Sequence, residues 1–383
     1  MIDERRKFLT TISQIGLLLG AVAIAYWPAR HGGYVLDDEQ LVVDSPLVKS
    51  PAGWYRFWTP EALDFWPITN DLFWIQWRLW GMNPTGYHVV NIALQIADSL
   101  LIWLVLLRLQ IPGAFLAAML FAVHPVNVES VAWISQLKNQ LSLWFFLLAI
   151  VAYLKSDLSF DRYYAFSIAA FVLAGLSKGS VLILPMILIL LDWYRGRLAS
   201  PGMIVRFVPF FLIAVVLALV DIWSQTHFTG TAVRSVTWDQ RFAGAGAVVW
   251  FYLAKALAPI GLVFVYPQWN IETDQLRWWL PLAGVVAVTA ALIWQRNNSR
   301  LPWVRPLLFA WAFFCLALLP VMGFTDVGFM KFSLVADHYQ QIALIAVMAV
   351  VAGFGTRLVQ IGQQRAPRVQ WVGSLAAIAV VVL

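Results

Sequence analysis

Residues 163–193 read YYAFSIAAFVLAGLSKGSVLILPMILILLDW, and this stretch decides what kind of fold the chain adopts. A membrane-spanning helix needs about 20 predominantly apolar residues. One helix over the whole run would be longer than a bilayer is thick, and Lys178 stands near its middle. The pattern therefore predicts two short membrane helices that meet at Lys178.

Similar apolar runs recur along the whole chain of 383 residues. Hydrophobic residues make up 61% of the sequence and charged residues 12%, against roughly 45–50% and about 25% in soluble domains. This composition excludes a soluble enzyme, a disordered chain and a disulfide scaffold, since Cys315 has no second cysteine to pair with. Basic loops of a membrane protein explain the net charge of +6, so we expect no nucleic-acid partner.

The apolar runs predict an all-α bundle of about 11 transmembrane helices. The first covers Phe8 to Trp27 and follows Arg5, Arg6 and Lys7, so we interpret it as a retained signal anchor rather than a cleaved signal peptide. The further apolar runs cover approximately 88–107, 112–124, 140–154, 163–176, 180–192, 204–223, 246–264, 278–294, 306–322, 339–356 and 371–383. Pro259 and Gly261 predict a broken, re-entrant or interfacial segment at 246–264.

Basic residues predict the orientation of this bundle. They concentrate in the loops that the scheme places in the cytoplasm, among them Arg108, Arg195 and Arg305. The N-terminus is then cytoplasmic, and the polar segment at about 30–86 becomes a long first extracytoplasmic loop. We expect one integral membrane domain over residues 1–383, in a bacterial inner membrane. The chain stops inside an apolar run, Gly373 to Leu383, which leaves a further C-terminal part open.

Ionisable residues near the outer rim are the candidates for chemistry, because a charge at membrane depth is costly. Asp37 and Asp38 follow the first span closely. Adjacent carboxylates repel, which suits one of them to general-base chemistry; a solvated acidic loop is the alternative interpretation. Lys178 needs an anionic partner, either a lipid phosphate or Asp337.

Other polar residues are expected at the same level of the membrane, near the ends of apolar segments. They are His88, Asn91, His124, Glu129, Lys138, Asp337 and His338. Ordinary hydrogen-bonded helix ends are the alternative interpretation of the histidines. Five scattered His residues argue against zinc, whereas the acidic loop leaves Mg²⁺ or Mn²⁺ open as a cofactor. Carboxylates, imidazoles and lysines at one rim of a bundle suit a lipid-linked phosphate donor.

Several motifs resemble those of a known family. The most specific is FAVHPVNVESVAW at 121–133, which KNQLS at 138–142 continues. NPTGYHVVN at 83–91 resembles a Pro-x-Gly-Tyr-His-x-x-Asn motif, and VLDD at 35–38 resembles an acidic motif. With these motifs the chain resembles the membrane domain of the transmembrane-and-tetratricopeptide O-mannosyltransferases and their bacterial relatives, in the GT-C glycosyltransferase superfamily.

The resemblance implies a GT-C type fold and an inverting transferase. Such an enzyme moves a sugar from a polyprenyl-phosphate donor to a hydroxyl of protein Ser/Thr or of a surface glycan, on the extracytoplasmic face. By analogy Asp37 is the first candidate for the general base and Asp38 the second. The candidates for holding or positioning the donor phosphate are His124, Glu129, Lys138, Lys178 and His338. A non-catalytic binder or transporter of lipid-linked sugars is the alternative hypothesis.

Three positions depart from the pattern of that family. Trp66 stands where an Arg is frequent, Gln95 where a second His is frequent, and Gly179 where a Glu follows the Ser-Lys pair. These departures leave the donor sugar open. No repeat of the tetratricopeptide period occurs in the sequence, which leaves acceptor recognition open.

Overall fold

The structure is a computed structural model that describes residues 2–59, 65–198, 202–229, 233–299 and 301–365. Within these ranges the chain is helical, and no β-strand occurs. In the described part of the chain, seven helices are long and apolar enough to cross a membrane, or eight if one bent pair counts as a span. The seven correspond to α1 (Ile2–Tyr26), α5 (Thr85–Arg108), α8 (Leu137–Ser156), α11 (Met203–Thr229), α13 (Leu280–Asn298), α14 (Val304–Leu318) and α15 (Gln341–Arg365).

This count is lower than the prediction because several apolar runs form short helices. The bent pair is α6 (Ala114–Ala122) and α7 (Val128–Ala132), which meet at an angle of 49°. Two further apolar helices, α9 (Arg162–Ser177) and α10 (Leu184–Tyr194), are too short to cross a bilayer unaided. The run predicted at 371–383 lies outside the described residues.

The break predicted within 163–193 is confirmed. Helix α9 ends at Ser177, and Lys178 has an extended backbone (φ −166°, ψ 136°). A short 3₁₀ turn, Gly179–Ile183, then leads into α10, where Pro185 occupies the first turn. An extended residue cannot continue the helical hydrogen-bond pattern. Lys178 therefore lies between the end of α9 and the turn that leads into α10.

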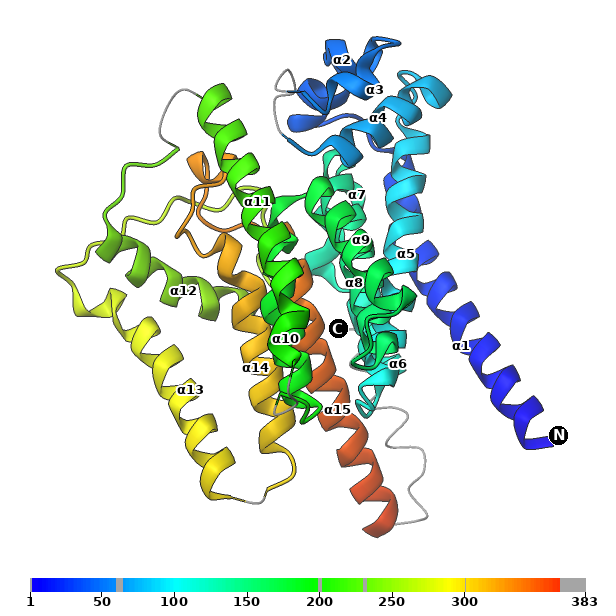
Figure 1. The fold of residues 1–383 in the computed structure, drawn as a ribbon, viewed down its shortest axis with the longest axis vertical. Coiled ribbons are helices and arrows are strands. Elements are labelled where there is room, and N and C mark those ends of the chain that lie inside the picture. The colour runs from blue at the N-terminus through cyan, green and yellow to red at the C-terminus, as the bar shows by residue number, and fades with distance from the viewer. Residues whose placement is uncertain (1, 60–64, 199–201, 230–232, 300, 366–383) are drawn as a thin grey trace.

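The segment predicted at 246–264 is also broken. It begins inside α12 (Trp238–Leu257), which lies across the long helices rather than along them (Figure 1). The helix stops just before Pro259, and Gly261 adopts a left-handed backbone (φ 62°). The residues from 258 to 275 are irregular and return the chain toward α13.

The segment at 30–86 is more ordered than a long loop. It contains α2 (Pro46–Lys49), α3 (Gly53–Arg56) and α4 (Pro67–Trp80), which lie together at one end of the bundle (Figure 1). A separate small core joins this segment to the start of α8. It consists of Val42, Val48, Phe57, Phe73, Tyr87, Ile134 and Leu137. This core holds the acidic motif against α8.

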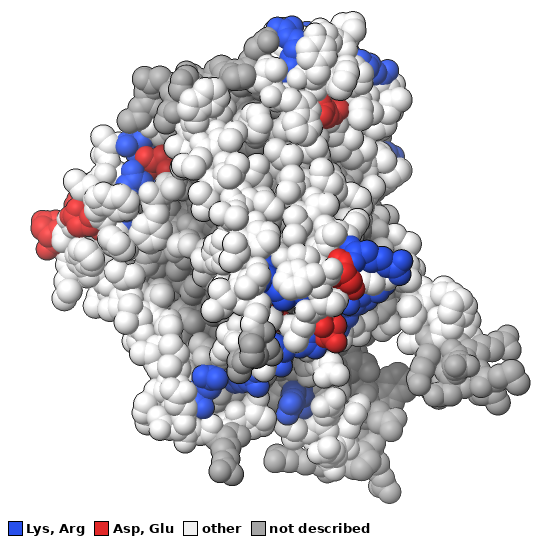
Figure 2. All heavy atoms as spheres, viewed as in Figure 1, with Lys and Arg blue, Asp and Glu red and all other residues white. Residues whose placement is uncertain are grey.

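The helices differ greatly in how much protein surrounds them. Helix α8 is the central element, packed against α5 and α9, and most of its span is buried. Helices α1 and α13 lie at the margin, and their spans are almost entirely uncovered by other helices. Figure 2 shows that Lys and Arg gather over the lower half of one face. Helices α5, α8, α10 and α13 all end there, and α9 and α14 begin there (Figure 1).

Candidate functional site at the acidic motif

The acidic motif forms a tight turn whose two aspartates have different environments. Leu36 adopts a left-handed backbone (φ 46°), which is unfavourable for a residue with a Cβ and a bulky side chain. Such strain persists only where surrounding contacts impose it. Here the backbone oxygen of Val35 accepts hydrogen bonds from the Asp38 N–H (3.0 Å) and from the Trp133 indole (3.2 Å).

Asp38 is the buried member of the pair. Its side chain is fully enclosed, and its carboxylate accepts three hydrogen bonds. The donors are the Val35 N–H (2.9 Å), the Ser135 N–H (2.7 Å) and the Ser135 hydroxyl. Burial raises the pKa of Asp38, and these hydrogen bonds only partly oppose the shift. Asp38 therefore fastens the turn to the segment that opens α8.

Asp37 is the accessible member of the pair. Its side chain is 49% exposed, and its carboxylate lies 3.5 Å from the ammonium of Lys138. Lys138 is itself 8% exposed and lies over two indole rings, 4.9 Å from the centre of Trp66 and 5.9 Å from that of Trp133. Aromatic faces attract a cation without neutralising it. The Lys138 ammonium is thus held in place, and the Asp37 carboxylate remains half-exposed on the side away from it.

A second group of polar residues lies along the neighbouring turn of α8. Asn139 accepts a hydrogen bond from the Lys178 ammonium through its side-chain oxygen, and its amide donates to the backbone oxygen of His338 (3.0 Å). The His338 ring nitrogen Nδ1 lies 2.8 Å from the Glu129 carboxylate, which also accepts from the His338 N–H (3.2 Å). Four of the predicted residues, Glu129, Lys138, Lys178 and His338, therefore meet around the start of α8.

A small cavity adjoins this group. Its polar lining includes Asn139, Lys178, Ser180, His338, Tyr339 and Gln341, and its apolar lining comes from α14 and the start of α15. Among the described residues, the Tyr339 hydroxyl and the Gln341 amide nitrogen have no hydrogen-bond partner. An ammonium with two unused polar groups beside it suits an anionic group of a ligand.

Asp337 and Lys178 are not the pair that the sequence suggested. Asp337 accepts a hydrogen bond from the Tyr266 hydroxyl (2.9 Å), whereas Lys178 binds Asn139. Of the two partners considered for Lys178, the described residues show no ion pair with Asp337, which binds Tyr266 from the irregular segment after α12. Neither Tyr266 nor Asn139 was among the predicted site residues.

The three remaining predicted residues contact backbone instead of the polar group. His88 lies 3.2 Å from the backbone oxygen of Gly32, and Asn91 donates to the backbone oxygen of Trp133 (3.1 Å). The His124 ring lies 3.1 Å from the backbone oxygen of Ala256. These contacts hold the segment that follows α1, the end of α7 and the last turn of α12 around the site.

The loop before Asp337 is fastened to α12 by a cluster of charges. Arg234 and Arg241 both donate to the Asp326 carboxylate, at 2.7–3.0 Å. Burial of Asp326 opposes its ionisation, but the two arginines outweigh it and lower the pKa of this carboxyl. The sequence analysis missed this cluster, since its members lie about 90 residues apart with no shared motif.

No metal site is evident in the part of the chain that the structure describes. There, no group of three or more His, Cys, Asp or Glu side chains is placed to hold an ion. Asp37 faces an ammonium and Asp38 is occupied by three donors. The residues present do not fit the Mg²⁺ or Mn²⁺ ion left open from the sequence, and no step below depends on one.

Comparison with curated proteins finds protein O-mannosyl-transferases among the relatives of this chain. A protein O-mannosyl-transferase of Caenorhabditis elegans is 25% identical over 305 residues, which cover 74% of this chain and 43% of that protein. Protein O-mannosyl-transferase TMTC1 of Mus musculus is 33% identical over 159 residues, 37% of this chain and 16% of the relative. Protein O-mannosyl-transferase TMTC4 of Homo sapiens is 32% identical over 196 residues, which cover 44% of this chain and 26% of that protein.

The chain resembles the protein O-mannosyl-transferases. The resemblance inferred from the motifs is thus confirmed. The chain spans less than half the length of these relatives. No family model matches the chain, and no solved structure does.

The departures from the O-mannosyl-transferase motifs have structural counterparts here. Trp66, in place of an Arg, provides one of the rings around Lys138. Gln95, in place of a His, donates to the backbone oxygen of Ala122 where α6 ends (2.9 Å). At Gly179, in place of a Glu, a Cβ atom would lie 2.7 Å from the carboxylate of Asp221 on α11. Asp221 also acts electrostatically on Lys178, so a carboxylate from another helix lies where the family side chain would begin.

Proposed function

We propose that the chain is a membrane glycosyltransferase that uses a polyprenyl-phosphate sugar. The acceptor would be a hydroxyl of protein Ser/Thr or of a surface glycan, as for the O-mannosyl-transferases it resembles. The observation that carries the proposal is the half-exposed Asp37 carboxylate, linked through Lys138 and Asn139 of α8 to the cavity beside Lys178. A general base, Asp37, and a site for an anion, beside Lys178, then lie next to each other at one end of the helix bundle.

The proposed reaction is a direct displacement. Asp37 takes the proton of the acceptor hydroxyl as the acceptor oxygen bonds to the anomeric carbon of the sugar. The bond between that carbon and the donor phosphate oxygen breaks, and polyprenyl phosphate leaves with the electron pair. Attack from the face opposite the phosphate inverts the anomeric configuration. Lys178 stabilises the negative charge that develops on the leaving phosphate.

The neighbouring residues have positioning roles in this proposal. Asp38 holds the strained turn at Leu36, and so sets the direction of Asp37. Lys138, which lies over the indoles of Trp66 and Trp133, holds the Asp37 carboxylate through their ion pair. Glu129 orients His338 through two hydrogen bonds. Because the basic helix ends lie at the other end of the bundle (Figures 1 and 2), we place the site on the extracytoplasmic face, in a bacterial inner membrane, with a cytoplasmic N-terminus.

The test uses the purified chain in lipid nanodiscs with a panel of polyprenyl-phosphate sugars. Release of polyprenyl phosphate is measured for the wild type, for Asp37→Asn and for Glu39→Gln. Glu39 is an exposed carboxylate two residues away, so it is a matched control. We expect a donor-specific release that Asp37→Asn abolishes and Glu39→Gln retains.

Separate measurement of donor binding distinguishes an enzyme from a binder. A general base acts mainly in the transition state, so Asp37→Asn should bind the donor as the wild type does. Saturable binding of a donor without release of polyprenyl phosphate under any condition would contradict the transferase proposal. It would favour a binder or transporter of lipid-linked sugars.

A further inference from the structure

The basic end of the bundle carries a cluster of arginines that the transfer site does not use. Helix α13 ends with Arg296 in its last turn, and α14 begins at Val304, directly before Arg305. The guanidinium carbon of Arg296 lies 5.1 Å from the ring centre of Trp193, and that of Arg305 lies 5.8 Å from the same centre. Two neighbouring helices thus bring their cations to one indole at the end of α10.

Arg305 is fixed in place by several contacts. Its guanidinium donates to the backbone oxygen of Trp193 (2.8 Å) and lies 5.9 Å from the ring centre of Tyr194. Tyr194 in turn stacks on Phe309 of α14, with ring centres 4.4 Å apart. One N–H group of the Arg305 guanidinium makes this backbone hydrogen bond. Its other N–H groups remain for a ligand, and their planar arrangement matches a phosphate.

This cluster lacks acidic partners. The sequence from residue 275 to 325 contains no Asp or Glu. In the described part of the chain, no ion pair links Arg296 or Arg305 to a carboxylate. The neighbouring Arg195 and Arg197 pair with the carboxylate of Asp157, and Asp192, directly before Trp193, also acts electrostatically on both. Arg296 and Arg305 thus keep positive charge that an anion from outside the chain can neutralise.

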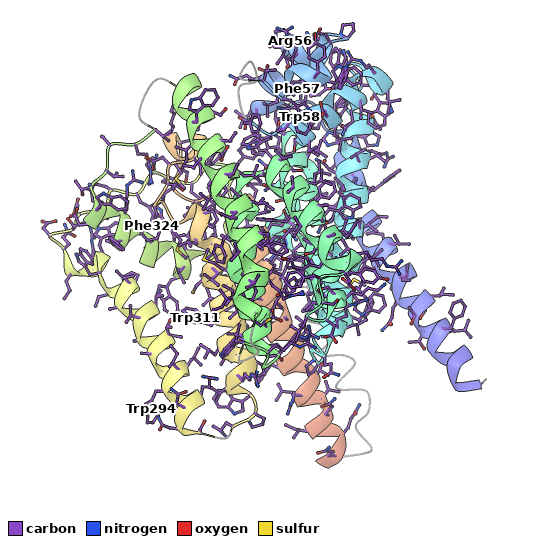
Figure 3. The ribbon with its side chains drawn as sticks, in the orientation of Figure 1. Arg56, Phe57, Trp58, Trp294, Trp311 and Phe324 are labelled. Atoms are coloured by element: carbon purple, nitrogen blue, oxygen red, sulfur yellow. The ribbon has the colours of Figure 1, made fainter. Side chains whose placement is uncertain are left out.

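The surroundings of the cluster are those of a lipid surface. Trp294 and Trp303 are 65% and 48% exposed, and each precedes one of the two arginines by two positions. Figure 3 shows Trp294 near the lower end of α13, with Trp58 near the opposite end of the molecule. Exposed tryptophans at helix ends are typical of the membrane interface. The span of α13 itself is only 6% buried, so its apolar side chains are available to acyl chains.

We propose that Arg296, Arg305 and Trp193 form a binding site for the headgroup phosphate of an anionic phospholipid. The phosphate would be held by the two guanidinium groups, and the acyl chains would lie along the uncovered surface of α13. Basic pockets between membrane helices are suited to anionic headgroups, because each arginine near the surface adds to the attraction. The site is separate from the acidic motif and does not depend on the proposed function.

The test is native mass spectrometry of the purified 383-residue chain in detergent, with phosphatidylglycerol or phosphatidylcholine added. We expect the wild type to retain phosphatidylglycerol more tightly. Each guanidinium should contribute about fivefold to that affinity, so Arg296→Gln with Arg305→Gln should remove most of the preference. The matched control is Arg357→Gln, which removes an exposed positive charge from α15 and should leave the preference intact.

Further arms identify the source of the phosphate and exclude misfolding. Arg305→Lys keeps the charge but loses the planar group, so it should retain more of the preference than Arg305→Gln and less than the wild type. Equal unfolding midpoints without lipid would show that all variants are folded. Inorganic phosphate at millimolar concentration should not displace phosphatidylglycerol, because it has no acyl chains. Displacement by inorganic phosphate, or an equal loss in Arg357→Gln and the double variant, would overturn the lipid site.

Discussion

The different environments of Asp37 and Asp38 lead to a prediction that separates catalysis from stability. Asp37→Asn and Asp38→Asn are the same chemical change at adjacent positions. We expect Asp37→Asn to lose turnover while folding normally, since its side chain is half-exposed and makes one ion pair. Asp38→Asn should destabilise the protein, since a buried amide replaces a carboxylate that has three donors.

The magnitudes follow from the contacts. Removal of a general base costs about 10²–10⁴-fold in rate. The Asp37 carboxylate is half-exposed, and an Asn side-chain oxygen can still accept a hydrogen bond from the buried Lys138 ammonium, so Asp37→Asn should cost less stability than Asp38→Asn. At Asp38 the amide nitrogen of Asn cannot accept, so the Val35 N–H or a Ser135 donor loses its partner. One lost hydrogen bond to a charged group and one unsatisfied buried donor lower the free energy of unfolding by about 2–4 kcal/mol.

The assay measures polyprenyl phosphate release and thermal unfolding on the same nanodisc preparations. Ser135→Ala is the control for Asp38, because it removes one donor and leaves the carboxylate. It should shift the unfolding midpoint in the same direction as Asp38→Asn, by a smaller amount. The reasoning is refuted if Asp37→Asn keeps wild-type turnover, or if Asp38→Asn loses turnover with an unchanged unfolding midpoint.

Three further predictions concern the residues around the acidic motif. Lys178→Gln should lower kcat/KM for the donor by about 10- to 100-fold, the value of one charged hydrogen bond; an unchanged kcat/KM would remove Lys178 from the phosphate site. Gly179→Ala should cost about 1–3 kcal/mol, because its Cβ would lie 2.7 Å from the Asp221 carboxylate, and Asp221→Ser in the same chain should recover part of this; strictly additive effects would contradict the contact. Asp326 has a lowered pKa, so its contribution to stability is complete above the ordinary pKa of about 4 and is lost as pH falls through the lowered value. Asp326→Asn should therefore unfold earlier than wild type at neutral pH, and the difference should narrow as pH falls below about 4; equal unfolding at neutral pH would exclude this role.

The sequence by itself determined the elements of this protein. Runs of apolar residues require helices in a membrane, where every backbone polar group needs a partner within the segment. A lysine inside such a run, or a Pro followed by a Gly, breaks the helix, and the structure has breaks at Lys178 and before Pro259. These outcomes depend on local composition alone, and so they could be predicted from it.

Only the tertiary structure decided which polar groups meet. Asp37 and Asp38 are equivalent in sequence, yet Ser135, which is 97 residues away from Asp38, buries one and leaves the other open. Glu129 and His338 are 209 residues apart and share a hydrogen bond, while Lys178 contacts Asn139 rather than Asp337. Such pairs depend on how whole helices pack around α8, and a carboxylate takes whichever donor that packing brings within about 3 Å.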